Sequence, residues 1–137
     1  MPHRVTLLSA FVVVGVLLLD ASSLPQPSTF SIVAYDRATA DIGVAVASKF
    51  PAVGALVPWA RAGVGAVATQ ALANLDYGPR GLEMLALGFS APQVREKLVE
   101  TDALRDDRQF GIVDAQGRAA AWTGPKYFRL CRPQRRR

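Results

Sequence analysis

The sequence predicts one small α+β domain between residues 29 and 125, in which an antiparallel sheet carries helices on one face. Three observations predict this class. Short runs of β-branched, aromatic and small residues are joined by close turns, which is typical of antiparallel hairpins. Two segments with apolar residues at helical spacing follow each other between these hairpins. Helices gathered together, rather than alternating with strands, favour α+β over a parallel α/β fold.

The first three predicted strands are residues 30–35, 42–48 and 63–69. A turn between Asp36 and Asp41 joins the first two strands into a hairpin. The second and third strands consist mostly of Gly, Ala and Val, which is typical of strands buried on both faces. Pro51 and Pro58 frame a loop or short edge strand over residues 53–57. We expect the three strands to lie in one antiparallel sheet.

Two helices and a second hairpin are predicted in the rest of the domain. Pro79 opens the first helix and Gly88 closes it. Ser90 caps the second helix, with Gln93 three residues later in the pattern of a capping box. The second hairpin has strands at 109–113 and 119–123, joined by a turn at 114–117.

Composition excludes several classes of function. The net charge of +5 comes from the C-terminal residues, because residues 29–125 hold nine Lys and Arg against ten Asp and Glu. We therefore expect no nucleic-acid partner, and we interpret residues 126–137 as a disordered basic tail. Cys131 is the only cysteine and His3 the only histidine, so a disulfide framework, a cysteine-rich metal site and Ser-His-Asp or Cys-His catalysis are all excluded in the domain. No cofactor or metal is expected.

The N-terminal residues have the features of an export signal. Arg4 precedes an apolar run over residues 5–19, and small residues follow at 21–23. The alternative is an uncleaved membrane anchor, but fifteen helical residues span only about 22 Å of a hydrocarbon core of about 30 Å. We expect a signal peptide at 1–23, a linker at 24–28 and a secreted or periplasmic protein whose only membrane contact is the signal.

Four stretches together point to a known family. They are 29–34 (TFSIVA), 42–54 (IGVAVASKFPAVG), 65–74 (GAVATQALAN) and 77–81 (YGPRG). In this order they resemble a bacterial and archaeal family catalogued as domain of unknown function 1028, which is placed in the N-terminal-nucleophile (Ntn) hydrolase superfamily. The resemblance covers residues 29–124 and implies a four-layer αββα sandwich. Family members continue with further sheet and helix elements where this chain has its arginine-rich tail, so we expect a sandwich truncated at the C-terminus.

The resemblance implies that Thr29 is the nucleophile, with its own α-amine as base. Independently, pairing Tyr35 with Ile42 across the first turn would place Ser48 opposite Thr29, with Lys49 next along the strand. A slip of one residue would exchange these two, so both stay candidates. Three further polar residues follow the third strand and are candidates for oxyanion or substrate binding, with capping of the next helix as the alternative: Thr69, Gln70 and Asn74.

Three interpretations of function follow. The first is an exported Ntn-type amide hydrolase that acts on a peptide-like or cell-wall-derived amide. The second is a non-catalytic module of the same fold that binds cell-envelope material, and the third is an inactive truncated remnant. Only the first requires Thr29 to be the first residue of the mature chain. A homo-oligomer is possible in each case.

Overall fold

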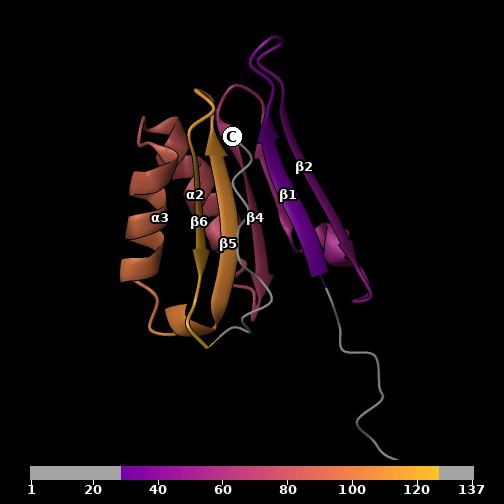
Figure 1. Cartoon of the computed structure of the whole chain (residues 1–137). Coiled ribbons are helices and arrows are strands. Elements are labelled where there is room, and N and C mark those ends of the chain that lie inside the picture. Colours follow the sequence, from indigo (N-terminus) through magenta and orange to yellow (C-terminus); the bar gives the residue numbers. More distant parts are fainter. Residues whose placement is uncertain (1–28, 127–137) are drawn as a thin grey trace, which may run out of the picture.

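The computed structural model describes residues 29–126, which form three stacked layers (Figure 1). Two helices form one outer layer, a four-stranded sheet lies in the middle, and a two-stranded hairpin forms the other outer layer. The α+β class with antiparallel strands is confirmed. The expected signal (1–23), the linker (24–28) and all but the first residue of the expected tail (126–137) lie outside the described residues.

The hairpin consists of β1 (Thr29–Tyr35) and β2 (Ile42–Ser48), paired antiparallel as the sequence predicts. Burial alternates along both strands, so one face lies against the middle sheet and the other faces away from it. The outward side chains include Phe30 and Ile32, which are 68% and 51% exposed. Within residues 29–126, no helix or strand covers this apolar face.

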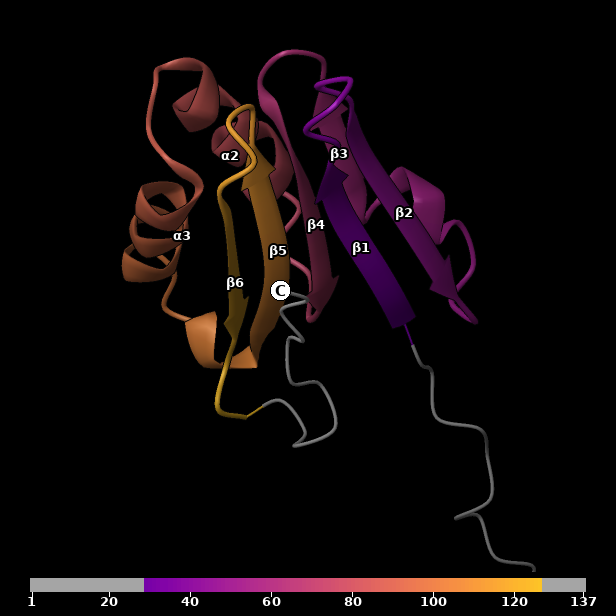
Figure 2. The same ribbon diagram turned by 45° about the horizontal axis from the view of Figure 1, so that its top comes forward.

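The middle sheet has the order β3-β4-β5-β6 with antiparallel pairing throughout. Its strands are β3 (Pro58–Arg61), β4 (Gly65–Ala71), β5 (Arg108–Asp114) and β6 (Ala119–Thr123). The expectation that the first hairpin and residues 63–69 share one sheet is wrong. Because β3 and β5 occupy both edges of β4, the hairpin stacks on the face of the sheet instead (Figure 2). A Cβ added at Gly111 would stand 3.6 Å from Val33 Cγ2, so a small residue lets the two layers approach closely.

The edge strand lies later in the chain than the prolines suggested. Residues Val53–Ala55 form a short 3-10 helix, η2, and the edge strand β3 starts at Pro58 instead of ending there. Proline is tolerated at the first position of an edge strand because its missing N–H is not needed for pairing. A second 3-10 helix, η3, covers Arg105–Asp107 and leads into β5.

The two helices, α2 (Tyr77–Ala86) and α3 (Ala91–Glu100), cover the face of the middle sheet that lies away from the hairpin (Figure 1). The predicted capping box is confirmed, since the Ser90 side chain accepts from the Gln93 N–H and the Gln93 side chain accepts from the Ser90 N–H. The core forms between helices and sheet from Val67, Tyr77, Leu82, Leu85, Ala91, Val94, Leu98, Phe110, Ile112 and Ala120. None of the described helices is long and apolar enough to cross a membrane.

Candidate functional site

Two hydroxyl groups meet where β1 starts and β2 ends. Thr29 and Ser48 are directly opposite in the hairpin, and Thr29 Oγ1 lies 2.9 Å from Ser48 Oγ. This is the register predicted from the sequence. Ser48 Oγ also accepts a hydrogen bond of 2.9 Å from the main-chain N–H of Phe50. That contact fixes the Ser48 hydroxyl and leaves its proton free to be directed to Thr29.

Lys49 lies beside this pair but not in it. The observed register places Ser48, not Lys49, across from Thr29, which decides between the two alternatives that the sequence left open. Lys49 follows the last residue of β2 and is exposed. Its ammonium group can therefore act on Thr29 only as a neighbouring charge, since nothing in residues 29–126 binds it to the hydroxyl pair.

Gln70 joins the middle sheet to the start of β1. In the orientation where the amide nitrogen faces an acceptor and the amide oxygen faces a donor, Gln70 makes two hydrogen bonds to β1. Nε2 donates to the main-chain carbonyl of Thr29 (3.1 Å), and Oε1 accepts from the main-chain N–H of Ser31 (3.0 Å). The Ser31 hydroxyl also contacts this amide. The amide nitrogen and the amide oxygen of Gln70 thus both form hydrogen bonds with the main chain of β1. In this arrangement Gln70 positions Thr29, and one of the two N–H donors of its amide is used on the Thr29 carbonyl.

Thr69 points to the opposite face of β4. It is fully buried, and among the described residues Thr69 Oγ1 has no hydrogen-bond partner. Its neighbour in the sheet is Phe110, which belongs to the core under the helices. The hairpin and its hydroxyl pair lie on the other side of the sheet, so Thr69 does not join Thr29 and Ser48.

The chain turns sharply just after Gln70. Ala71 has a φ of 66°, in the left-handed region that alanine rarely adopts. The next carbonyl, that of Leu72, accepts a hydrogen bond from Arg108 Nη1. A left-handed backbone at a residue with a Cβ persists only where surrounding contacts hold it. The bond from the buried Arg108 to the Leu72 carbonyl is such a contact next to Ala71. The turn directs residues 72–76 away from the hydroxyl pair and toward the helices.

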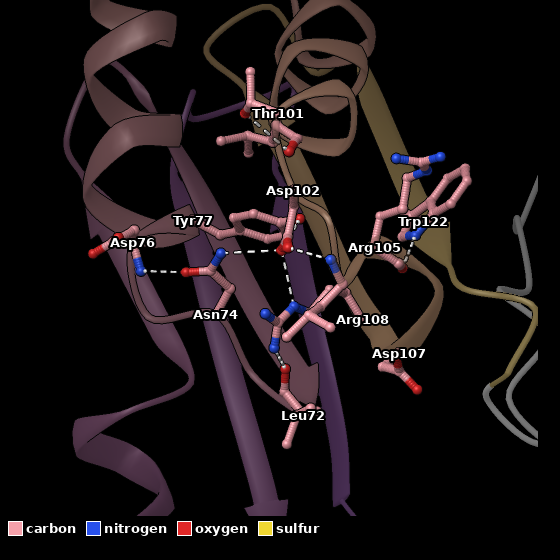
Figure 3. A network of polar contacts seen from close by, with 12 residues as sticks. Leu72, Asn74, Asp76, Tyr77, Thr101, Asp102, Arg105, Asp107, Arg108 and Trp122 are labelled. Atoms are coloured by element: carbon pink, nitrogen blue, oxygen red, sulfur yellow. Dashed lines mark hydrogen bonds and ion pairs between the residues drawn. The ribbon is translucent and has the colours of Figure 1, made fainter.

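Asn74 takes part in a separate buried network around Asp102 (Figure 3). Asp102 Oδ2 accepts hydrogen bonds from Asn74 Nδ2 (3.1 Å), Tyr77 Oη (2.8 Å) and Arg108 Nε (2.9 Å). The Asp102 and Arg108 side chains are only 9% and 10% exposed, so the network holds a buried ion pair. Asn74 Oδ1 also accepts from the N–H of Asp76 (3.1 Å), the residue just before α2, whereas no side chain caps the first turn of the helix itself.

Titration in this network follows from burial and from the hydrogen bonds. Burial alone would raise the pKa of Asp102, but the hydrogen bonds from Arg108, Asn74, Leu104 and Tyr77 outweigh it and hold that pKa well below its ordinary value. Burial, together with the neighbouring Asp102 carboxylate, raises the pKa of Tyr77 far above its ordinary value. At neutral pH the network therefore contains an ionised Asp102 and a neutral Tyr77. Its role is to tie the loop after β4 to the loop before β5.

Sequence reasoning missed Asp102, Arg108 and Asp114 as buried polar groups. The sequence predicts only a turn that starts at Asp114, but the carboxylate of this residue is buried, accepts from the N–H of Ala91 (3.0 Å) and pairs with Arg118 (2.7 Å). Burial would raise the pKa of Asp114, yet these contacts lower it. The sequence gives no signal of this burial, because Tyr77, which binds Asp102, and Ala91, which binds Asp114, lie more than twenty positions away. No group of three or more His, Cys, Asp and Glu among residues 29–126 could hold a metal ion.

Comparison with known proteins places the chain in a family. The model of a family of unknown function, DUF1028, matches residues 29–135. The chain belongs to this family. The match extends ten residues beyond Pro125, the predicted end of the domain.

A solved DUF1028 structure has the same fold. It is the protein SPO2555 from Silicibacter pomeroyi, which is 32% identical, with a TM-score of 0.70. The similarity covers 74% of this chain and 46% of that protein, so the chain spans just under half of its solved relative's length. No curated protein matches the sequence.

Proposed function

We propose that this DUF1028 chain is part of an exported amide hydrolase of the Ntn type, with Thr29 as nucleophile once it is the first residue of the mature chain. One observation carries the proposal: Thr29 Oγ1 lies 2.9 Å from Ser48 Oγ at the start of β1, while Gln70 binds the adjacent main chain. The hydroxyl of Ser48 is the one side-chain partner of Thr29 Oγ1 within residues 29–126, and it is no base. A base must therefore come from elsewhere, and a free α-amine on Thr29 itself would supply one.

The proposed reaction is amide hydrolysis through an ester. An α-amino group titrates near pH 7.7–8.0, about right for a base at neutral pH. It takes the proton from Thr29 Oγ1 as this oxygen attacks the carbonyl carbon of the amide. The proton then passes to the leaving nitrogen as the C–N bond breaks, and the acyl group stays on Thr29 as an ester. Water, activated by the same amine, hydrolyses the ester, releases a carboxylic acid and restores the hydroxyl.

The surrounding residues have supporting roles in this proposal. We assign Ser48 Oγ, 2.9 Å away, as the donor to Thr29 Oγ1, which orients the nucleophile toward the substrate. Lys49, the next residue, supplies a positive charge that favours the unprotonated amine. Gln70 fixes the carbonyl of Thr29 and so limits the directions that the amine and the hydroxyl can take. The substrate class is a peptide-like or cell-wall-derived amide, in keeping with export.

The test is to express the full chain, with its N-terminal segment, in an exporting bacterial host. Intact mass and N-terminal sequencing should find a mature chain that starts at Thr29. A β-lactone probe, which acylates an N-terminal threonine, should label this chain and its Thr29→Ser variant but not Thr29→Ala. Thr39→Ala is the matched control, because Thr39 lies in the exposed turn of the hairpin and should leave labelling unchanged.

Two results would contradict the proposal. A mature chain that still starts at Ser22 or Leu24 would leave the Thr29 nitrogen in a peptide bond and remove the base. A folded chain that starts at Thr29 but resists the probe would favour the non-catalytic binding module instead.

A further inference from the structure

A hollow of about 420 Å³ lies between α3 and β6 on the helix side of the middle sheet. Its floor is apolar, because Val99 of α3 and Trp122 of β6 pack against the core while part of each side chain stays accessible. The other residues that line it are charged: Arg95, Glu96 and Glu100. A partly exposed indole ring beside charged groups suits a polypeptide with aromatic and charged side chains.

The charges of the lining favour a cation. Arg95 Nη2 lies 3.0 Å from Glu96 Oε1, so these two charges offset each other. One arginine against two glutamates leaves one net negative charge, and Glu100 carries it, since this residue has no ion pair within residues 29–126. Glu100 is also the last residue of α3, where the helix dipole favours positive charge.

Lys126, the last described residue, lies beside this hollow. Trp122 Nε1 donates to the carbonyl of Arg105 in η3 (2.8 Å; Figure 3). The N–H of Lys126 donates to the carbonyl of the next residue, Asp106 (3.1 Å), and Lys126 Nζ pairs with Asp107 (3.2 Å). The chain therefore continues from a point one residue away from the carbonyl that holds the Trp122 ring.

Residues 127–137 have the composition that the hollow would bind. Tyr127 and Phe128 come first, Arg129 follows, and the whole segment holds five arginines and no acidic residue. Six extended residues reach up to about 20 Å, which exceeds the length of the hollow, since Arg95 and Glu100 are only about 7.5 Å apart along their helix. The family model also extends into this segment, as far as residue 135.

We infer that residues 127–132 of this chain fold back onto the hollow. The rings of Tyr127 and Phe128 cover the apolar floor, and the guanidinium of Arg129 pairs with the carboxylate of Glu100. A tethered segment of the same chain is favoured over a free partner, because its effective concentration is on the order of millimolar. This inference does not depend on the proposed hydrolase activity, and it replaces the disordered tail that composition predicts.

The pairing of Arg129 with Glu100 also places Cys131. Two residues of extended chain span about 6.6 Å, and four residues of a helix span about 6 Å. A segment that runs against the direction of α3 therefore brings Cys131 beside Glu96, one helical turn before Glu100.

Cys131 is the only cysteine of the chain and provides the test. In the full chain, Glu96→Cys should form a disulfide with Cys131 under mild oxidation. Lys97→Cys is the matched control, because Lys97 is the next residue of α3 and is also exposed, but it lies over the Phe89 ring and does not line the hollow. We expect the disulfide to form about tenfold faster in Glu96→Cys, since Cα atoms must come within about 4.4–6.8 Å. Intact mass and non-reducing electrophoresis distinguish a disulfide within one chain from one between chains.

A charge swap tests the role of Arg129. In the Glu96→Cys background, Arg129→Glu should slow the disulfide about threefold or more, because two carboxylates then face each other. Adding Glu100→Lys restores opposite charges and should recover the rate. Far-UV circular dichroism should be the same for all these variants, which separates a lost contact from a lost fold.

Three results would overturn the inference. The first is equal disulfide rates in Glu96→Cys and Lys97→Cys. The second is a disulfide that forms only between chains and depends on protein concentration, because the hollow would then accept a second copy. The third is an Arg129→Glu variant that forms the disulfide as fast as its parent, since Arg129 would then not pair with Glu100.

Discussion

Removing the charge of Asp102 should destabilise the domain severely. Asp102→Asn keeps the size of the side chain but cannot pair with Arg108, whose guanidinium is buried and has Asp102 Oδ2 at 2.9 Å. The variant leaves a buried cation whose remaining partner is the carbonyl of Leu72. Breaking a buried ion pair on one side costs about 3–5 kcal/mol of unfolding free energy. Small domains have only about 5–15 kcal/mol in total, so the loss is a large share.

The double variant separates the cost of the unpaired charge from the loss of contacts. Adding Arg108→Met to Asp102→Asn removes the uncompensated cation and should recover about 1 kcal/mol or more. Asp76→Asn is the matched control, because Asp76 is exposed and its side chain makes no capping bond to α2. This control should change the unfolding free energy by less than about 0.5 kcal/mol.

The assay is urea denaturation followed by far-UV circular dichroism and by the fluorescence of Trp59 and Trp122. Because the pKa of Asp102 is lower in the folded state than its ordinary 3.8, its contribution is present above pH 3.8 and is lost as the pH falls further. The wild type should therefore lose stability between pH 4 and pH 2 more steeply than Asp102→Asn. A loss below about 1 kcal/mol at pH 7 in Asp102→Asn, or parallel acid profiles, would refute the role assigned to the ion pair.

Two further changes test the packing of the layers. Gly78→Ala would place a Cβ 2.2 Å from the ring of Trp59, so it should lower the unfolding free energy by about 1–3 kcal/mol. The control Gly54→Ala has open space around the new Cβ and should leave the unfolding free energy unchanged. Equal melting temperatures for the two variants would contradict the packing of α2 on β3. Ile32→Lys puts a charge on the exposed apolar face of the hairpin, so we expect less aggregation and little change in melting temperature. Light scattering of concentrated full-length protein measures the aggregation and should fall. Unchanged scattering would show that this face does not drive aggregation.

The sequence alone predicts the first hairpin, the two helices and the second hairpin, but not the edge strand at Pro58–Arg61. Alternating apolar patterns, turn residues and a capping box depend on neighbours within a few positions, so the hairpin register and the cap at Ser90 could be predicted. Counting residues outward from one turn predicts that Thr29 faces Ser48 or, after a slip of one residue, Lys49, and the observed register selects Ser48.

Only the tertiary structure decided which strands share a sheet and where the polar residues after β4 point. Patterns of Gly, Ala and Val predict that a strand is buried on both faces. They do not tell whether another strand pairs with its edge or packs on the face of its sheet, so the stacking of the hairpin on β4 could not be predicted. Gln70 reaches β1 across that stack, while Thr69 points to the helices and Asn74 joins Asp102. These residues are close in sequence, but the alternation of a strand and the turn at Ala71 send them to three different surroundings.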